Sequence, residues 1–147
     1  MRPCFAPQIL NPPKTIPDPE APCSLVLIEG ALCRMNRKGR AVVRRTPVGT
    51  AIVQFLVTTG GALVLREEAA GFLPGFSNLY CLDAEMRLLW FAELPGPEDF
   101  FAEPVREAEG VFACTSISGV ECRLDPATGR IVGRTSRARA AGSAAGA

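Results

Sequence analysis

The chain contains 147 residues, of which 48% are apolar and 21% are charged, and its formal net charge is +1. This length and composition are typical of a single globular domain that buries a core. They exclude a general electrostatic attraction to nucleic acid or to acidic membranes, and no stretch approaches the roughly 20 uninterrupted apolar residues of a transmembrane helix. The absence of histidine removes the most common acid–base group and metal ligand near neutral pH.

The N-terminal segment, residues 1–22, contains seven of the thirteen prolines. Because proline fixes φ and lacks an amide donor, we predict a disordered, extended lead-in without regular structure. The first residues lack the apolar run of a signal peptide, so a cytoplasmic location with reduced cysteines is expected. The six cysteines form no C-x-x-C pair, which argues against a zinc site, and most are expected to be buried as small apolar groups.

Residues 23–134 are predicted to form one repeat domain of β hairpins. Ser24–Ile28 is an apolar β run, followed by a turn at Glu29-Gly30 and a second run over 31–35. Arg37–Arg40 forms the next turn, in which glycine supplies a positive φ. Further β-type runs follow at 41–43, 51–57, 62–65, 100–105, 110–114, 120–124 and 131–132. No segment shows a sustained period of 3.6 residues, so the fold class is all-β.

The C-terminal segment, residues 135–147, consists largely of arginine, alanine and glycine. It offers no large apolar side chain to bury, and we predict a disordered tail.

A short pattern occurs three times along the repeat domain. Each copy is an apolar strand that ends in Asn36, Asp83 or Asp125, and the three anchors lie 47 and 42 residues apart. A recurrence of this length is typical of propeller blades. An Asn or Asp oxygen can accept backbone N–H groups two residues on, so each anchor predicts a tight turn into a further strand.

The repeat resembles the blades of PQQ-like (quinoprotein-like) β-propellers, whose motif has the form ALDxxTGxxxW. Leu82-Asp83 with Trp90 matches the ends of this motif, and Leu124–Gly129 matches its middle. The resemblance implies that Trp90 packs between neighbouring blades and that Gly129 belongs to the turn. The first copy departs from the motif, and the third has Gly133 in place of tryptophan. Asn78–Asp83 is also similar to small bacterial proteins of comparable length that carry a few such hairpins.

The chain supplies about two and a half blades, whereas the quinone enzymes of this family are much longer closed propellers that bind quinone and calcium. An open stack would leave sheet edges exposed. Three outcomes stay open: a partial propeller that self-associates, hairpins that close into a compact small barrel, or a part of a larger propeller.

The sequence offers no group suited to catalysis, and no catalytic residue, metal or cofactor is expected. The carboxylates at Glu67-Glu68, at Glu98-Asp99 and at 103–109 lie beside glycine or proline, and we predict that they occupy surface turns. A cysteine nucleophile would have no histidine as its base.

The leading hypothesis is a non-enzymatic protein-interaction module of the accessory or immunity type. Its predicted contact residues are the apolar side chains of the Gly71–Phe76 loop, with two arginines: Phe72, Leu73, Phe76, Arg44 and Arg45. The alternative for this loop is that it folds down and caps the core.

Charge is unevenly distributed in the sequence. Seven basic and no acidic residues lie in 30–66, and eight acidic residues lie in 83–109. This split fits solvated strands or a head-to-tail contact with a partner or another copy. Two other functions remain as alternatives: a degenerate cofactor-binding unit of a quinoprotein-like enzyme, and weak nucleic-acid binding through the basic segment 34–45. No membrane partner is expected.

Overall fold

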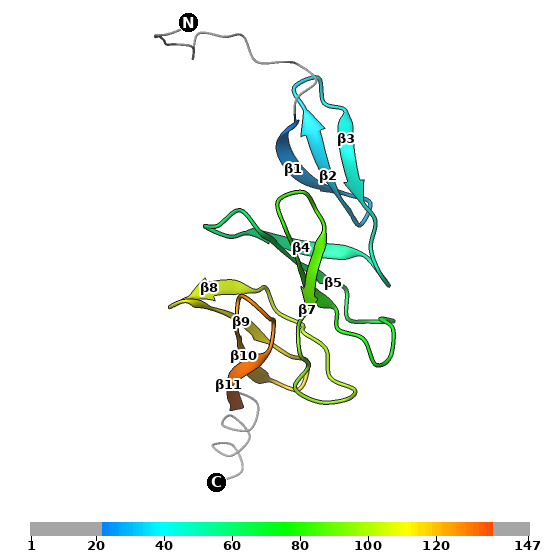
Figure 1. Ribbon diagram of the computed structural model, residues 1–147. Helices are drawn as coiled ribbons and strands as arrows, with labels where there is room; N and C mark the ends of the chain where they lie inside the picture. The colour runs from blue at the N-terminus through cyan, green and yellow to red at the C-terminus, as the bar shows by residue number, and fades with distance from the viewer. Residues whose placement is uncertain (1–21, 137–147) are drawn as a thin grey trace, which may run out of the picture. The chain divides into compact units, whose positions relative to one another are not determined.

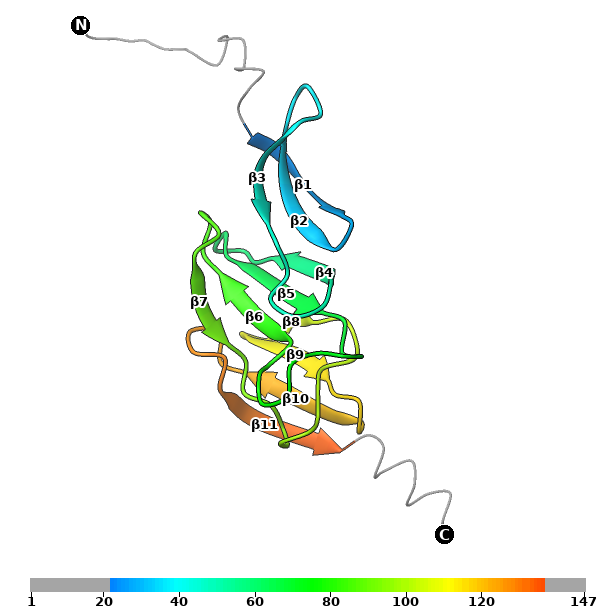
Figure 2. The same ribbon diagram turned by 90° about the vertical axis from the view of Figure 1, so that its right-hand side faces the viewer.

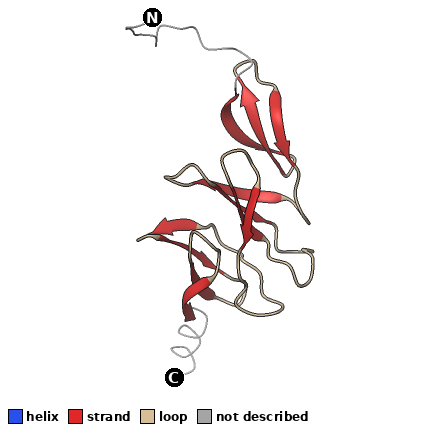
Figure 3. Cartoon of the chain, viewed as in Figure 1, coloured by secondary structure: helices blue, strands red, loops and turns tan. Residues whose placement is uncertain are grey.

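The computed structural model describes residues 22–136, and this part of the chain is built from strands, turns and loops (Figure 3). The predicted lead-in (1–22) and tail (135–147) lie outside the described residues, except for position 22 in the first strand and positions 135–136 in the last. The strands in chain order are β1 (Pro22–Ile28), β2 (Ala31–Asn36), β3 (Ala41–Arg45), β4 (Ile52–Val57), β5 (Leu63–Glu67), β6 (Leu79–Leu82), β7 (Leu88–Phe91), β8 (Arg106–Ala108), β9 (Val111–Thr115), β10 (Val120–Leu124) and β11 (Ile131–Ser136).

The strands form three antiparallel sheets in chain order, so the all-β prediction is confirmed (Figure 1). The first sheet has the order β1-β2-β3, and the other two are four-stranded, with the orders β4-β5-β6-β7 and β11-β10-β9-β8. None of the three closes into a barrel. Within residues 22–136, no helix could span a membrane. The chain divides into two compact units, and the described residues of the first are 22–26 and 33–44, while the second holds 27–32 and 45–136.

The three anchor residues adopt related turns. The amides of Asn36 and Asp83 donate to the carbonyls four residues on, whereas the turn after Asp125 is one residue longer. Asn36 Oδ1 accepts the amides of Lys38 and Arg40 at 2.9 and 3.0 Å. Asp83 Oδ1 accepts two amides in the same positions of its own turn, at 2.9 and 2.8 Å, and Asp125 Oδ1 accepts that of Ala127 at 2.9 Å. These bonds come from short side chains at the end of a strand, which is why the turn could be predicted from local sequence.

The anchors also show which strand the first sheet lacks. Asp83 and Asp125 follow the third strand of their sheets, whereas Asn36 ends the second strand of its own. The strands β1 to β3 therefore correspond to the last three strands of each complete sheet. No described strand pairs with the outer edge of β1. The prediction of about two and a half blade-like units is confirmed, with one three-stranded and two four-stranded sheets.

The main core lies between the two four-stranded sheets of the second unit (Figure 2). It is apolar on both sides and contains Val64, Leu79, Cys81, Trp90, Ala92, Phe101, Val105, Phe112, Cys114, Cys122 and Leu124. Core residues of one strand lie two positions apart, at 79 and 81, 112 and 114, and 122 and 124, because alternate side chains of a strand face the same side of its sheet.

Two amide side chains link these sheets. Gln54 on β4 donates to the Val105 carbonyl at 2.9 Å and accepts its amide at 2.8 Å. Buried Asn78 donates to the Phe101 carbonyl at 2.8 Å and accepts the Phe101 amide at 2.9 Å. Each side-chain amide thus pairs with one backbone N–H and one C=O of the connector that precedes β8, as a neighbouring strand would.

Trp90 lies between the same two sheets. Its ring packs against the 125–130 turn, and Nε1 donates to the Pro126 carbonyl at 2.9 Å. The approach is close because position 129 is glycine: a Cβ there would lie 2.3 Å from the Trp90 ring. The Glu93 amide also donates to the Gly129 carbonyl at 2.8 Å. This junction requires both a large ring on one sheet and a residue without a side chain on the other.

The prediction that Glu67 occupies a surface turn is wrong. Glu67 ends β5 and its side chain is completely buried, whereas its neighbour Glu68 is exposed. Its carboxylate accepts the backbone amides of Val48, Gly49 and Thr50 at 2.6, 2.9 and 2.9 Å. The Tyr80 hydroxyl donates to the same carboxylate. These four donors replace the lost water, which is how a charged group tolerates burial.

Tyr80 is held in its protonated form beside Glu67. Burial raises the pKa of the Tyr80 hydroxyl well above its usual value, and the hydrogen bond to Glu67 and the charge of Glu67 add to this shift. The Arg45 guanidinium acts in the opposite direction. The carboxylate is saturated with donors, so the cluster serves to hold the 48–50 segment against β5.

Candidate functional site

The loop predicted to bind a partner divides into a buried and an exposed part. Phe72 is only 5% exposed, and its ring packs edge-on against Phe100 with the centroids 5.9 Å apart. A Cβ at Gly49 would lie 2.9 Å from the same ring. Phe72 is therefore buried within the chain and is not exposed to a partner, because its ring is enclosed by neighbouring segments.

The exposed part of the loop borders an apolar hollow, which we call the β7 groove. It has a volume of about 630 Å³ and lies between the end of the loop and the connector that follows β7. Phe76, which is 56% exposed, forms one side of it. The lining residues are Gly75, Phe76, Ser77, Phe91, Ala92, Leu94, Gly96 and Pro97. Leu73 is also partly exposed but does not line this groove.

The β7 groove continues into the free edge of a sheet. Among the strands of residues 22–136, only β6 pairs with β7. The Ala92 amide donates toward β6, to the Leu79 carbonyl at 2.8 Å. Because bonding directions alternate along an antiparallel strand, the N–H and C=O of Phe91 point away from β6. The edge thus presents backbone groups directly beside the groove.

The β7 edge lacks the charges that usually protect such edges. Its residues are Leu88, Leu89, Trp90 and Phe91, and all except Trp90 are exposed. Sequence reasoning missed this strand as part of a site. The available signal was the uninterrupted apolar run Leu88–Phe91. A strand with one face exposed to solvent is expected to alternate apolar and polar residues.

The two predicted arginines do not share one exposed surface. Arg44 is exposed, but Arg45 is half-buried. The Nε atom of Arg45 is buried without a hydrogen-bond partner in the described chain, and its charge acts on Tyr80. Arg45 thus lies beside the Glu67–Tyr80 cluster, and its role as a partner contact stays a prediction.

The described cysteines are buried thiols, as predicted. Cys33, Cys81, Cys114 and Cys122 are at most 2% exposed and unpaired. Burial raises the pKa of Cys81 to about 11, with a further contribution from the charge of Asp83. Burial is also the main cause that raises the pKa of Cys122 to about 11 and that of Cys114 to about 12. Within 22–136, no group of three or more cysteine and carboxylate side chains is arranged to bind a metal ion.

These shifts predict unreactive thiols, since the thiolate is the nucleophile. In folded protein at pH 8, we expect iodoacetamide to modify Cys81, Cys114 and Cys122 at least about 100-fold more slowly than in urea-unfolded protein. Peptide mapping by mass spectrometry measures each rate. Equal rates in the two states would contradict this account.

The three successive antiparallel sheets, each with an Asn or Asp anchor at a turn, resemble a partial β-propeller. No protein-family model matches the chain, and no curated protein does. Among solved structures, the crystal structure of BamB from Moraxella catarrhalis is similar, with a TM-score of 0.52 and 14% sequence identity. The similarity covers 77% of this chain and 34% of the BamB chain. BamB is a PQQ-like β-propeller protein, so the likeness supports a propeller-like fold for this chain.

Proposed function

We propose that the chain is a non-enzymatic protein-interaction module that binds an extended, apolar segment of a protein partner along β7. The observation that carries this proposal is the position of the β7 groove beside a free, uncharged strand edge. The edge supplies main-chain hydrogen bonds to an added strand, and the groove receives one of its side chains.

The chemistry of the groove indicates the kind of segment it binds. Phe76, Phe91 and Leu94 make the lining mostly apolar, and the volume of about 630 Å³ is sufficient for a large side chain. Exposed aromatic residues are frequent anchors of protein interfaces. The absence of charge on β7 favours an extended segment with alternating small apolar and polar residues and one leucine or phenylalanine at the groove.

Defined peptides test this function. Fluorescein-labelled peptides that alternate valine with threonine and carry one leucine or phenylalanine should bind the full chain in a fluorescence anisotropy titration. Phe76→Ser should weaken this binding by about tenfold or more, because truncating an anchor residue costs more than about 1.4 kcal/mol. Thermal unfolding should be nearly unchanged, since Phe76 is mostly exposed.

Two controls distinguish strand addition at β7 from nonspecific hydrophobic binding. Val132→Ser removes another exposed apolar residue, on β11, and should leave the affinity unchanged. Peptides with N-methylated backbones cannot donate to the edge and should bind much more weakly. The proposal is overturned if no peptide binds, or if the methylated peptides bind as well as the others.

A further inference from the structure

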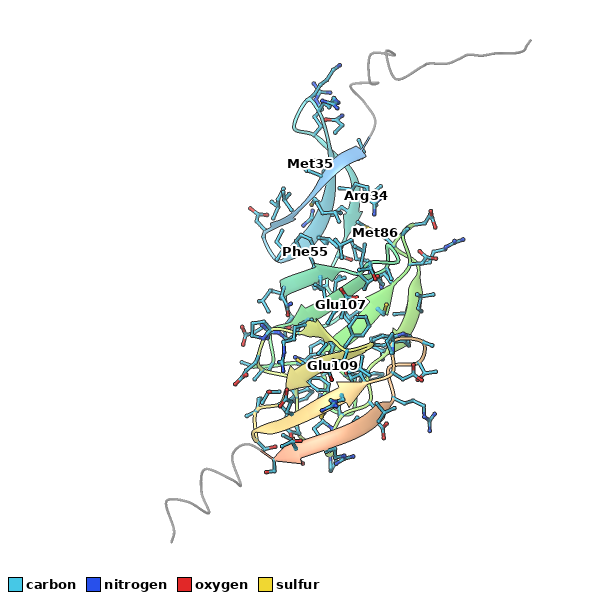
Figure 4. The ribbon with its side chains drawn as sticks, turned by 90° about the vertical axis from the view of Figure 1, so that its left-hand side faces the viewer. Arg34, Met35, Phe55, Met86, Glu107 and Glu109 are labelled. Carbon is cyan, nitrogen blue, oxygen red and sulfur yellow. The ribbon has the colours of Figure 1, made fainter. Side chains whose placement is uncertain are left out.

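A second hollow of the second unit carries two carboxylates, and we call it the acidic groove. It has a volume of about 560 Å³ and lies between the β4–β5 turn and the β8–β9 turn. Glu107 and Glu109 lie on the β8 side of it and are exposed (Figure 4). Buried Cys81 and Phe112 also line it, so apolar surface lies next to the two charges.

The two carboxylates are not engaged in ion pairs within the described part of the chain. Neither Glu107 nor Glu109 forms an ion pair with any residue of 22–136, whereas Glu121 pairs with Arg106 at 2.6 Å. Apolar surface beside these carboxylates comes from Leu89, Val111 and Pro126. This combination fits an arginine side chain, whose stem covers apolar surface while its guanidinium binds carboxylates with two parallel hydrogen bonds.

The β2–β3 turn presents such arginines on the same chain. Arg37 and Arg40 are exposed at the two ends of the Arg37–Arg40 turn. The turn is held by the Asn36 side chain, which accepts two of its amides, and by Gly39 with a φ of +79°. No acidic residue lies between 30 and 66, so nothing near them in sequence neutralises this charge.

From this complementarity we propose that the occupant of the acidic groove is the β2–β3 turn of a second copy of the chain. Arg37 and Arg40 of one copy bind Glu107 and Glu109 of the next, with the arginine stems against the apolar lining. The contact is heterologous, because it joins two different surfaces. None of these four charged residues lines the β7 groove, and the two surfaces meet at Leu89, which belongs to the β7 edge and also lines the acidic groove.

Charge reversal of each surface tests the contact by sedimentation. The wild-type chain should show an average mass that rises with concentration at low salt. Glu107→Lys with Glu109→Lys should weaken self-association by more than about 100-fold, because like charges then face each other. Arg37→Glu with Arg40→Glu should have the same effect. A rise in ionic strength from about 0.05 M to 0.5 M should weaken the wild-type contact by about tenfold or more.

Mixing the two reversed variants gives the decisive result. Each should be monomeric alone, and the mixture should associate, since the basic groove of one variant accepts the acidic turn of the other. Glu68→Lys with Glu98→Lys changes the charge by the same amount at exposed positions outside the acidic groove and should behave as wild type. Unfolding curves establish that each variant is folded. A wild-type chain that stays monomeric at all concentrations, or a mixture of folded variants that does not associate, overturns the proposal.

Discussion

Replacing Glu67 with alanine should lower the free energy of unfolding by about 3–5 kcal/mol. The substitution leaves three backbone amides, at 48–50, and the Tyr80 hydroxyl without their acceptor. The Glu67 side chain is fully buried, so water takes the place of its carboxylate poorly. Urea unfolding followed by circular dichroism measures the loss.

Two further variants identify the cause of this loss. Glu68→Ala removes an exposed neighbouring carboxylate, for which no hydrogen bond or ion pair of the side chain is found in the described chain, and should change the stability by less than about 0.5 kcal/mol. Tyr80→Phe removes one of the four donors and should cost about 1–2 kcal/mol. If Glu67→Ala were as mild as Glu68→Ala, the buried carboxylate would not hold the 48–50 segment.

Replacing Gly129 with alanine is expected to destabilise the chain by about 3–5 kcal/mol, for two separate reasons. Its φ of +76° is strained for any residue with a side chain, at about 1–2 kcal/mol. In addition, the new Cβ would lie 2.3 Å from the Trp90 ring, which must move out of the junction between the two sheets. The same unfolding measurement gives the total.

The two contributions can be separated experimentally. Gly61→Ala has a similar φ of +89° but open space around the new Cβ, so it should show the backbone strain alone. Gly129→Ala should cost less when Trp90 is already replaced by leucine, because the collision is gone, and the double-mutant cycle measures this coupling. If Gly61→Ala and Gly129→Ala lowered the free energy of unfolding equally, the packing of Trp90 would not require a glycine at position 129.

Local chemistry explains why much of the fold could be predicted. The β-type runs, the positive φ at Gly39 and Gly129, and the anchor turns depend on residues within a few positions of each other. Asn36 ends the second strand of its sheet, whereas Asp83 and Asp125 follow the third strand of theirs. The first sheet is therefore one strand short of the other two. Such short-range preferences act on any chain with these residues, whatever its tertiary context.

The candidate site could be predicted only in part. Aromatic residues in a loop indicated an interaction surface, and Phe76 lines the β7 groove, but Phe72 is enclosed beside Phe100. The two differ by contacts with a connector more than twenty residues away, which loop composition does not encode. Leu94 and Pro97 were missed for the same reason, since they face the groove only after that connector has packed against the loop.

By itself, the sequence determined the all-β class, the period of its repeat and the turns at Asn36, Asp83 and Asp125, because these follow from short-range steric and hydrogen-bonding preferences. Only the tertiary structure decided which charges and aromatic rings are buried. Glu67 is inside because amides 17 to 19 residues away surround it. Burial depends on segments that meet after folding, so adjacent glutamates with the same intrinsic chemistry occupy opposite environments.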